Sequence, residues 1–138
     1  MIGIEKHSQA CDELFQHLMR AMQRKGVYVG SSPGYPRAEI VSVNEQSTLD
    51  KGGDVRQVLV TIDSMSGKGF GEAFEVSQGN LDRIMDAEDA TESYRILGVT
   101  ESNATTREDM SDTQAVFYRV TNNLTFYLES KEWQNWET

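Results

Sequence analysis

The stretch DVRQVLVTID, residues 54–63, decides the fold. Its central part, VLVTI (58–62), places an apolar side chain at every second position. Successive side chains of a strand point to opposite faces, so this alternation predicts a strand with one apolar face. The segment Arg37–Val43 predicts a second strand, and the polar residues 44–53 between the two are too many for a tight turn. We therefore expect an antiparallel hairpin with a projecting tip.

An amphipathic helix is predicted ahead of these strands, from about Lys6 to Lys25. Ser8 is suited to cap its N-terminus, and Gly26 is the expected stop. Apolar residues recur along it every three or four positions, which is the spacing of one helix face. These residues are Cys11, Leu14, Phe15, Leu18 and Met22.

A second helix is predicted from about Glu72 to Ala87, after the glycine-rich segment 64–71. That segment lacks the residue spacing of the known phosphate-binding loops, so we interpret it as a connector. The side of the helix that we expect to be buried carries Phe74, Ser77, Leu81, Ile84 and Met85.

Three further extended segments complete the pattern, with Val27–Val29 before the hairpin and two in the last third of the chain. Tyr94–Thr100 predicts one strand, and Gln114–Leu128 predicts a longer strand or a bent pair with a bulge at 122–123. The polar residues 101–113 between them are predicted to form a loop.

The resulting order is α-β-β-β-α-β-β, which predicts an α+β fold with two helices packed on a mostly antiparallel sheet. The length of 138 residues suits a single domain, which we assign to residues 1–130. Residues 131–138 form a C-terminal tail with Trp133 and Trp136. Tryptophan is enriched at interface hot spots, so this tail either folds back on the domain or, as we favour, anchors to a neighbour.

The composition excludes several classes of protein. The 22 acidic residues outnumber the 13 basic ones and leave a net charge of −9, which argues against binding nucleic acid through its phosphates or docking on anionic lipid. The lone Cys11 cannot form an internal disulfide. Because neither a membrane span nor a signal peptide is recognisable, we expect a protein made in a reducing cytoplasm.

Catalytic and metal-binding constellations are weak. His7 and Cys11 are four residues apart on the first predicted helix, but the chain offers few further ligands for zinc. No serine stands in a Gly-x-Ser-x-Gly motif, and the acidic cluster at 86–89 is interpreted as a solvated turn. The sequence therefore predicts no enzyme, no catalytic residue, no metal and no cofactor.

Nearly the whole chain, about residues 10–130, resembles the tail-completion or tail-terminator proteins of long-tailed bacteriophages. The resemblance rests on element order and on the segments VYVGSSPGYPRAEIVSV (27–43), VRQVLVTIDSMSGKG (55–69), FGEAFEVSQGNLDRIM (70–85) and DMSDTQAVFYRVTNNLTFYLES (109–130). It implies a non-enzymatic virion protein at the head–tail junction, present in the host cytoplasm before assembly. Such proteins form a ring, typically a hexamer, that caps the tail-tube protein and joins it to the head–tail connector proteins.

The resemblance also implies that DNA passes through the lumen of this ring without tight binding. The acidic side chains on the two long polar segments are our interface candidates, together with Trp133 and Trp136. They are Glu45 and Asp50 on the hairpin tip and Glu101, Glu108 and Asp109 on the predicted acidic loop. An acidic wall would repel the passing phosphates rather than hold them.

Two alternatives remain open from sequence. The chain could be another head–tail connector component, an adaptor or a stopper. It could also be a small α+β ligand-binding or regulatory module, with a cleft between its helices and its sheet.

Overall fold

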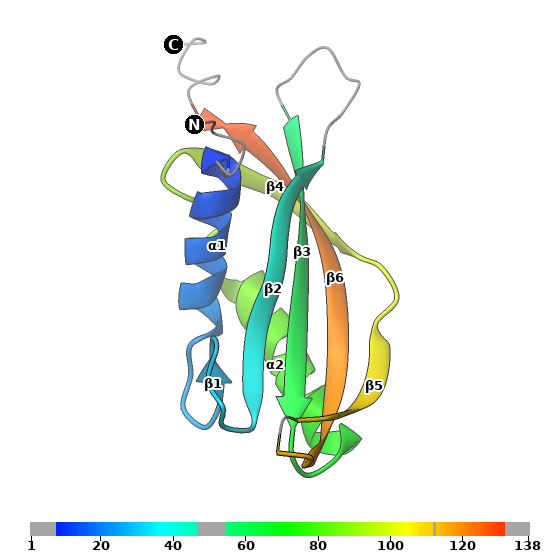
Figure 1. Cartoon of the computed structure of the whole chain (residues 1–138). Coiled ribbons are helices and arrows are strands. Elements are labelled where there is room, and N and C mark those ends of the chain that lie inside the picture. The colour runs from blue at the N-terminus through cyan, green and yellow to red at the C-terminus, as the bar shows by residue number, and fades with distance from the viewer. Residues whose placement is uncertain (1–7, 47–54, 112, 132–138) are drawn as a thin grey trace, which may run out of the picture.

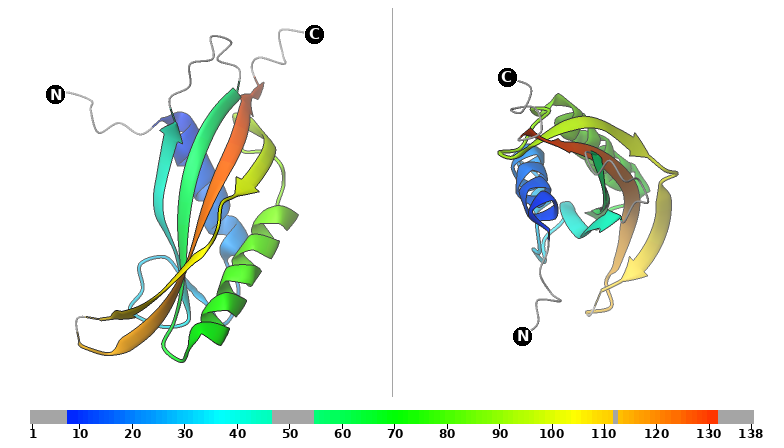
Figure 2. Two further views of the ribbon diagram at one scale, coloured as in Figure 1. Left: turned by 90° about the vertical axis from the view of Figure 1, so that its right-hand side faces the viewer. Right: turned by 90° about the horizontal axis from the view of Figure 1, so that it is seen from above.

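The structure is a computed structural model that describes residues 8–46, 55–111 and 113–131. A curled sheet carries both helices on one face, as the three views show (Figure 1 and Figure 2). The α+β fold class is confirmed. In chain order the elements are α1 (Gln9–Met22), β1 (Tyr28–Val29), β2 (Arg37–Gln46), β3 (Val55–Ser66), α2 (Phe70–Asp86), β4 (Tyr94–Glu101), β5 (Thr105–Met110) and β6 (Val116–Ser130).

The sheet has the order β1-β2-β3-β6-β4, and β5 also pairs with β6. All pairs are antiparallel except the short pair of β1 with β2. β3 and β6 form the centre of the sheet, paired without interruption from Val55 and Glu129 to Ser66 and Tyr118. The alternation predicted for β3 is confirmed, since Val58, Val60 and Ile62 are all buried.

α1 is capped by Ser8 as predicted, but it begins at Gln9, later than the predicted Lys6, and ends earlier than predicted. The Ser8 side chain accepts a hydrogen bond from the Cys11 backbone N–H at 3.1 Å, which satisfies one of the free donors at the helix start. The helix ends at Met22, and Gly26, with φ of +88°, makes the turn that follows. A left-handed φ of this kind is one that glycine adopts without strain.

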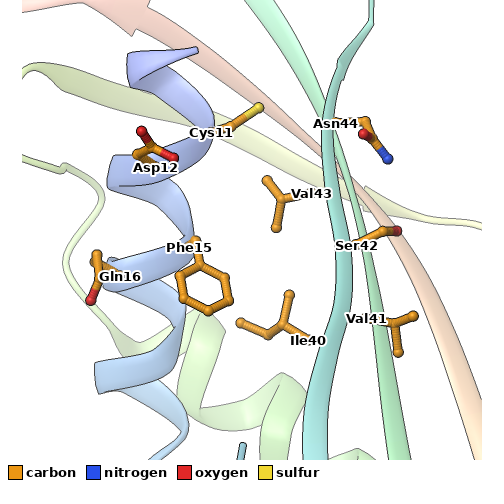
Figure 3. Close-up of a pocket in the computed structure, with 9 residues that line it drawn as sticks. All are labelled: Cys11, Asp12, Phe15, Gln16, Ile40, Val41, Ser42, Val43 and Asn44. Carbon is orange, nitrogen blue, oxygen red and sulfur yellow. The ribbon is translucent and has the colours of Figure 1, made fainter. Parts of the chain in front are cut away.

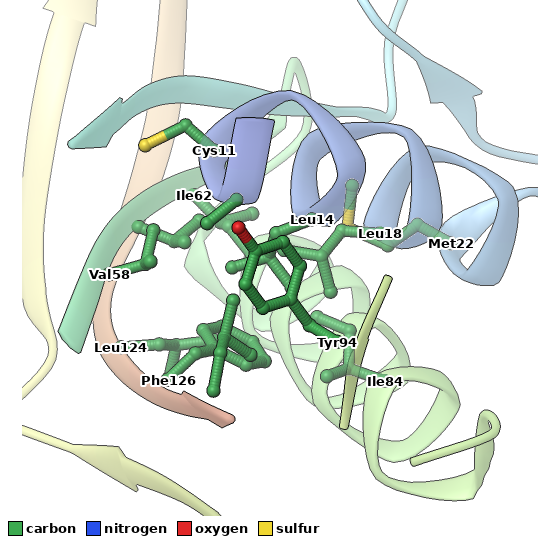
Figure 4. Packing of buried hydrophobic residues seen from close by; sticks show 13 residues of the cluster. Cys11, Leu14, Leu18, Met22, Val58, Ile62, Ile84, Tyr94, Leu124 and Phe126 are labelled. Carbon is green, nitrogen blue, oxygen red and sulfur yellow. The ribbon is translucent and has the colours of Figure 1, made fainter. Parts of the chain in front are cut away.

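The core lies between the two helices and the sheet (Figure 4). α1 contributes most of the large side chains from the helices, and β3 and β6 contribute the opposite wall. The fully buried members include Leu14, Leu18, Met22, Val58, Ile62, Phe126 and Leu128. Burial of each such side chain is worth about 1.5–3 kcal/mol, so this contact holds the fold together.

The buried face of α2 differs from the predicted one. Phe74 and Met85 are 49% and 64% exposed, so their predicted burial was wrong, whereas Ser77 and Ile84 are buried as expected. Leu81 is only half-buried. The buried face of α2 mixes apolar and polar side chains, namely Ala73, Val76, Ser77, Asn80 and Ile84.

Hydrogen bonds explain why a polar face of α2 can be buried. The Ser77 hydroxyl donates to the Asn122 side chain at 2.7 Å, and the Asn80 amide donates to the Ser64 hydroxyl at 2.9 Å. The Arg24 guanidinium donates to the Asn80 side-chain oxygen at 2.9 Å. Buried polar groups with partners avoid the free-energy cost of lost hydration.

The predicted loop at 101–113 is also wrong, because β5 lies within it and pairs with β6. Nearly all of β5 is exposed, so its residues carry no apolar alternation that would reveal a strand. β6 itself has no bulge against β3 at 122–123. What changes there is the partner on its other side, from β4 to β5, with the Ser102 N–H donating to the Asn123 carbonyl at 3.1 Å.

Candidate interaction surfaces

The outer edge of β2 is open over most of its length. β1 pairs only with Arg37 and Ala38, and no strand among the described residues pairs with this edge from Glu39 to Gln46. A bulge between Ile40 and Ser42 leaves Val41 outside the ladder and 53% exposed. A bulge on an edge strand interrupts the row of free N–H and C=O groups and so disfavours uncontrolled pairing.

A cavity of about 540 Å³ lies between α1 and this strand (Figure 3). Phe15 from α1 and Ile40 and Val43 from β2 point into it, whereas Val41 points away from α1. Asp12 and Gln16 stand at its outer side. The α1–β2 cavity therefore combines an apolar floor with a polar rim.

The opposite edge of the sheet is formed by β4 and β5. A bulge between Ile96 and Gly98 turns Leu97 outward, where it is 49% exposed, just as Val41 is turned outward on β2. Farther along, the hairpin of β5 and β6 projects from the body (Figure 2) and exposes Met110 and Val116 near its turn. Residues 89–91 bond to the start of β4, where the Ile96 N–H donates to the Asp89 carbonyl at 2.7 Å, so this edge is open only beyond Ile96. The two edges of the sheet are thus open in part, apolar in part, and different from each other.

A ladder of charges fixes β5 to the sheet on the face that the helices leave free. The Arg119 guanidinium donates to Asp63 on β3 at 2.6 Å and to Asp109 on β5 at 2.8 Å. Asp63 also accepts from the Thr121 hydroxyl at 2.7 Å, and Arg107 pairs with Asp109 at 2.7 Å. Burial lowers the pKa of Arg119, but the bonds to Asp63 and Asp109 outweigh it and raise the pKa. This ladder holds three neighbouring strands in register.

The outer side of α2 carries two exposed apolar side chains, Phe74 and Met85. Leu81, between them on the helix, packs partly against the core, and Leu97 of β4 lines a cavity together with Met85. Between α2 and β4 lies a second cavity of about 220 Å³, the α2–β4 cavity. Its walls include Leu18, Ile84, Met85, Leu97, Val99 and Phe126, with the carboxylates of Glu88 and Asp89 at its rim.

The predicted acidic residues do not gather at one place. Glu45 lies near the open end of the hairpin and pairs with Arg56 at 2.8 Å. Glu101, at the end of β4, accepts from the Asn122 side chain at 2.7 Å, and Asp109 belongs to the charge ladder. Glu108 is exposed on β5.

Three of the predicted interface residues, Asp50, Trp133 and Trp136, lie outside the described residues. Sequence reasoning missed the outer stripe of α2 as a surface, because it interpreted the same apolar residues as core. It also missed the cavity residues of β2 and β4. The only available signal was the pair of apolar runs at the bulges, Ile40–Val41 and Ile96–Leu97, which break strict alternation.

Two negative findings concern the described part of the chain. It contains no group of three or more His, Cys, Asp or Glu side chains that could hold a metal ion. Cys11 is a buried free thiol, and His17 is buried on the same helix. Burial and Arg20 lower the pKa of His17, against the effect of its hydrogen bond to the Glu88 backbone. None of the helices in this part of the chain is long and apolar enough to cross a membrane.

Comparison with known proteins gives a likeness of fold. No family model matches the chain, and no curated protein sequence matches it. Among solved structures, the fold is similar to a chain in the virion of a native gene transfer agent (GTA) particle, with a TM-score of 0.58 and 18% sequence identity. The match covers 88% of this chain and 99% of that chain. The two chains therefore share a fold over almost their whole length.

Proposed function

We propose that this protein is a structural virion protein without catalytic activity, which forms a ring that caps the tail tube and joins it to the head connector. The observation that carries the proposal is the likeness of nearly the entire fold to a chain in the virion of a gene transfer agent particle. The resemblance of the sequence to tail-terminator proteins supports the finer part of the proposal, the ring and its place between the tail tube and the head connector.

The two open edges of the sheet are suited to ring contacts. A ring with cyclic symmetry needs two unlike surfaces on each copy that meet head to tail. One edge here consists of β2 with α1 beside it, and the other consists of β4 and β5 with α2 beside them. β2 is open from Glu39 and β4 beyond Ile96, and each edge presents apolar side chains, so both halves of such a contact are available on one chain.

The strand directions favour the same contact. β2 is antiparallel to β3, β3 to β6 and β6 to β4, so β2 and β4 run in opposite directions. Two copies placed side by side in the same orientation would therefore bring β4 of one against β2 of the next as antiparallel neighbours. Antiparallel pairing is slightly more stable per residue than parallel pairing.

Chemical cross-linking tests this ring. Asn44 on β2 and Thr100 on β4 are exposed, lie in the same row of the sheet, and are on the face without helices. In a Cys11→Ala background, the double variant Asn44→Cys and Thr100→Cys should give a ladder of cross-linked species up to six copies on purified tails. Each single variant is the matched control and should give no ladder. Monomers only, or equal cross-linking of the single variants, would contradict the ring contact.

The charge of the protein bears on its relation to DNA. With a net charge of −9, the protein should bind duplex DNA negligibly at physiological salt. Weak binding suits a ring through which DNA passes, because the ring must not hold the phosphates. Glu108 is exposed on β5 and belongs to none of the described ion pairs, so its substitution leaves those pairs intact. Filter binding or fluorescence anisotropy measures the affinity of the protein for duplex DNA. Tight binding by the unmodified protein would contradict the role of a ring through which DNA passes.

A second candidate is a small-ligand module that uses the α1–β2 cavity. Its volume of about 540 Å³ lies within the usual range of ligand sites, which is roughly 300–1,000 Å³. A thermal-shift screen with small metabolites separates the two functions. A ligand that raises the melting temperature of wild type, and not of a Phe15→Trp variant that fills the cavity, would favour the ligand module.

A further inference from the structure

Charged side chains form a band across the face of the sheet that the helices leave free. At its centre, Asp63 on β3 and Arg119 on β6 are bonded to each other. Residues directly opposite each other on neighbouring strands share a face. Glu39 on β2 lies opposite Asp63, and Arg107 on β5 lies opposite Arg119. Because β2 and β5 lie on opposite sides of the sheet (Figure 1), the band begins with a carboxylate at one edge and ends with a guanidinium group at the other.

Glu39 is a carboxylate beside another carboxylate. Like charges directly opposite each other destabilise a sheet, and the neighbouring Asp63 is already bonded to Arg119. Among the described residues Glu39 forms no ion pair, although it is half-buried where the β2 edge opens. Arg37, two residues earlier on the same face, instead donates to a backbone carbonyl of the loop before β2 and to a methionine sulfur. A cation from another chain would therefore stabilise Glu39.

Arg107 is the converse, a guanidinium group that can still donate. Its side chain is 74% exposed, and its Nε atom bonds the Asp109 carboxylate at 2.7 Å. The same carboxylate accepts from Arg119 at 2.8 Å, so Asp109 is shared between two cations. No further ion pair within the described part of the chain involves Arg107, so its terminal nitrogens can donate to a second carboxylate. Hydrogen bonds between arginine and a carboxylate are charge-assisted and strong.

Glu39 and Arg107 of one copy are too far apart to pair. β3 and β6 lie between β2 and β5, so three strand spacings, or about 14 Å, separate the two residues. An ion pair needs its nitrogen and oxygen atoms within about 4 Å of each other. Any pairing between these two residues therefore joins two copies of the chain.

The proposed ring brings the two edges together. β5, like β4, is antiparallel to β6, so it also runs opposite to β2 of the next copy. The registers of the strand pairs place Glu39 and Thr105 in one row of the sheet. A neighbouring copy in the same row therefore has its Glu39 beside Thr105, with Arg107 as the diagonal neighbour at about 7–8 Å between Cα atoms. The long arginine side chain spans this distance.

We propose that the guanidinium group of Arg107 in each copy of the ring pairs with the carboxylate of Glu39 in the next copy. This proposal rests on the proposed ring and names the charges that order it. A head-to-tail contact joins unlike charges, whereas two β2 edges facing each other would bring two Glu39 carboxylates together. Like charges across a contact suppress wrong pairings, so this ion pair favours a ring over a two-fold dimer.

Charge reversal in the cross-linking experiment tests the ion pair. In the double-cysteine background, Glu39→Lys and Arg107→Glu, each alone, should lower the yield of the cross-linked ladder on purified tails several-fold, with circular dichroism showing a folded domain. The variant that carries both reversals should restore the yield. Lys68→Glu is the matched control, because it reverses an exposed charge just after the central strand β3 and should leave the ladder unchanged.

A mixture of the two single variants gives a second test. In an alternating ring of Glu39→Lys copies and Arg107→Glu copies, every contact between neighbours joins unlike charges. The equimolar mixture should therefore form the ladder with the yield of the unreversed protein, although each variant alone forms it poorly.

Three outcomes would overturn the ion pair. Single variants with an unchanged yield would leave the ring intact and remove Arg107 and Glu39 from its contact. Single variants that lose the ladder, with no recovery in the double reversal or in the mixture, would mean that each residue acts within its own copy. Absence of the ladder in the double-cysteine protein itself would overturn the ring and, with it, the ion pair.

Discussion

The two helices are both amphipathic, yet they bury their predicted stripes to different extents. On α1 the predicted stripe faces the sheet, and Leu14, Leu18 and Met22 are fully buried. On α2 the predicted stripe is divided, since Ile84 is buried whereas Phe74 and Met85 are exposed. The difference teaches that periodicity identifies a helix, while the neighbouring strands determine which face is covered. An apolar face that its own domain leaves uncovered is available to another part of the chain or to another copy.

The largest expected effect belongs to the core of α1. Leu18→Ala should lower the free energy of unfolding by about 2–5 kcal/mol, because it removes a fully buried side chain and leaves a cavity. Urea unfolding followed by circular dichroism measures this. A loss below about 0.5 kcal/mol, the range of surface substitutions, would show that α1 does not cover the sheet as described.

The next effect tests the polar face of α2. Asn80→Ala should cost about 1–3 kcal/mol, because it removes the Asn80 oxygen that Arg24 donates to and the amide that the buried Ser64 hydroxyl accepts from. Asn123→Ala is the matched control, since Asn123 accepts from Thr61 on an exposed face and should cost no more than about 0.5 kcal/mol. Equal losses in the two variants would mean that α2 is not held by its polar face.

A smaller effect concerns pH and the start of α1. Burial alone would raise the pKa of Glu13, but its hydrogen bonds with Ser93, Thr91 and Gln9 lower it below the ordinary value of 4.5. A lowered folded-state pKa contributes stability that is complete above pH 4.5 and is lost as the pH falls through the folded-state value.

Glu13→Gln should therefore be less stable than wild type by about 0.5–1.5 kcal/mol at pH 7, and the difference should shrink towards pH 3. Chemical unfolding across this pH range measures it. Glu92→Gln, at an exposed neighbouring position, should follow the pH dependence of wild type. A Glu13→Gln difference that is constant with pH would refute the role of this carboxylate.

The smallest effect belongs to the outer stripe of α2. Phe74→Ser should change the free energy of unfolding of the monomer by no more than about 0.5 kcal/mol, since the side chain is half exposed. A loss of 2 kcal/mol or more, comparable to that of Leu18→Ala, would contradict the difference between the two helices and show that Phe74 belongs to the core.

The same contrast explains what could be predicted from the sequence. α1 and β3 were predictable because each buries one face against an apolar partner, and burial imposes its period on residues such as Leu14 and Val58. β5 was not predictable, because its side chains are exposed and its pairing depends on the backbone of β6 and on Arg119. A strand without a buried face leaves no pattern of apolar residues.

The candidate surfaces were predictable only in part. The acidic residues were chosen because they lie in long polar segments, but Glu45, Glu101 and Asp109 have partners within the chain. The cavities at the two edges of the sheet depend on how α1 packs beside β2 and α2 beside β4, which is a tertiary arrangement. The acidic residues can be counted in the sequence, whereas the shape of the sheet edges is known only from the tertiary structure.

The central claim, a ring at the end of the tail tube, is tested most directly by cryo-electron microscopy of purified tails. Averaged density at the end facing the head should contain one closed ring of copies, six by the resemblance, with the β2 edge of each copy against the β4–β5 edge of the next. A tube end without this protein, or copies bound singly along the tube wall, would contradict the account. A ring placed above the tube, against the portal, would instead identify an adaptor or a stopper.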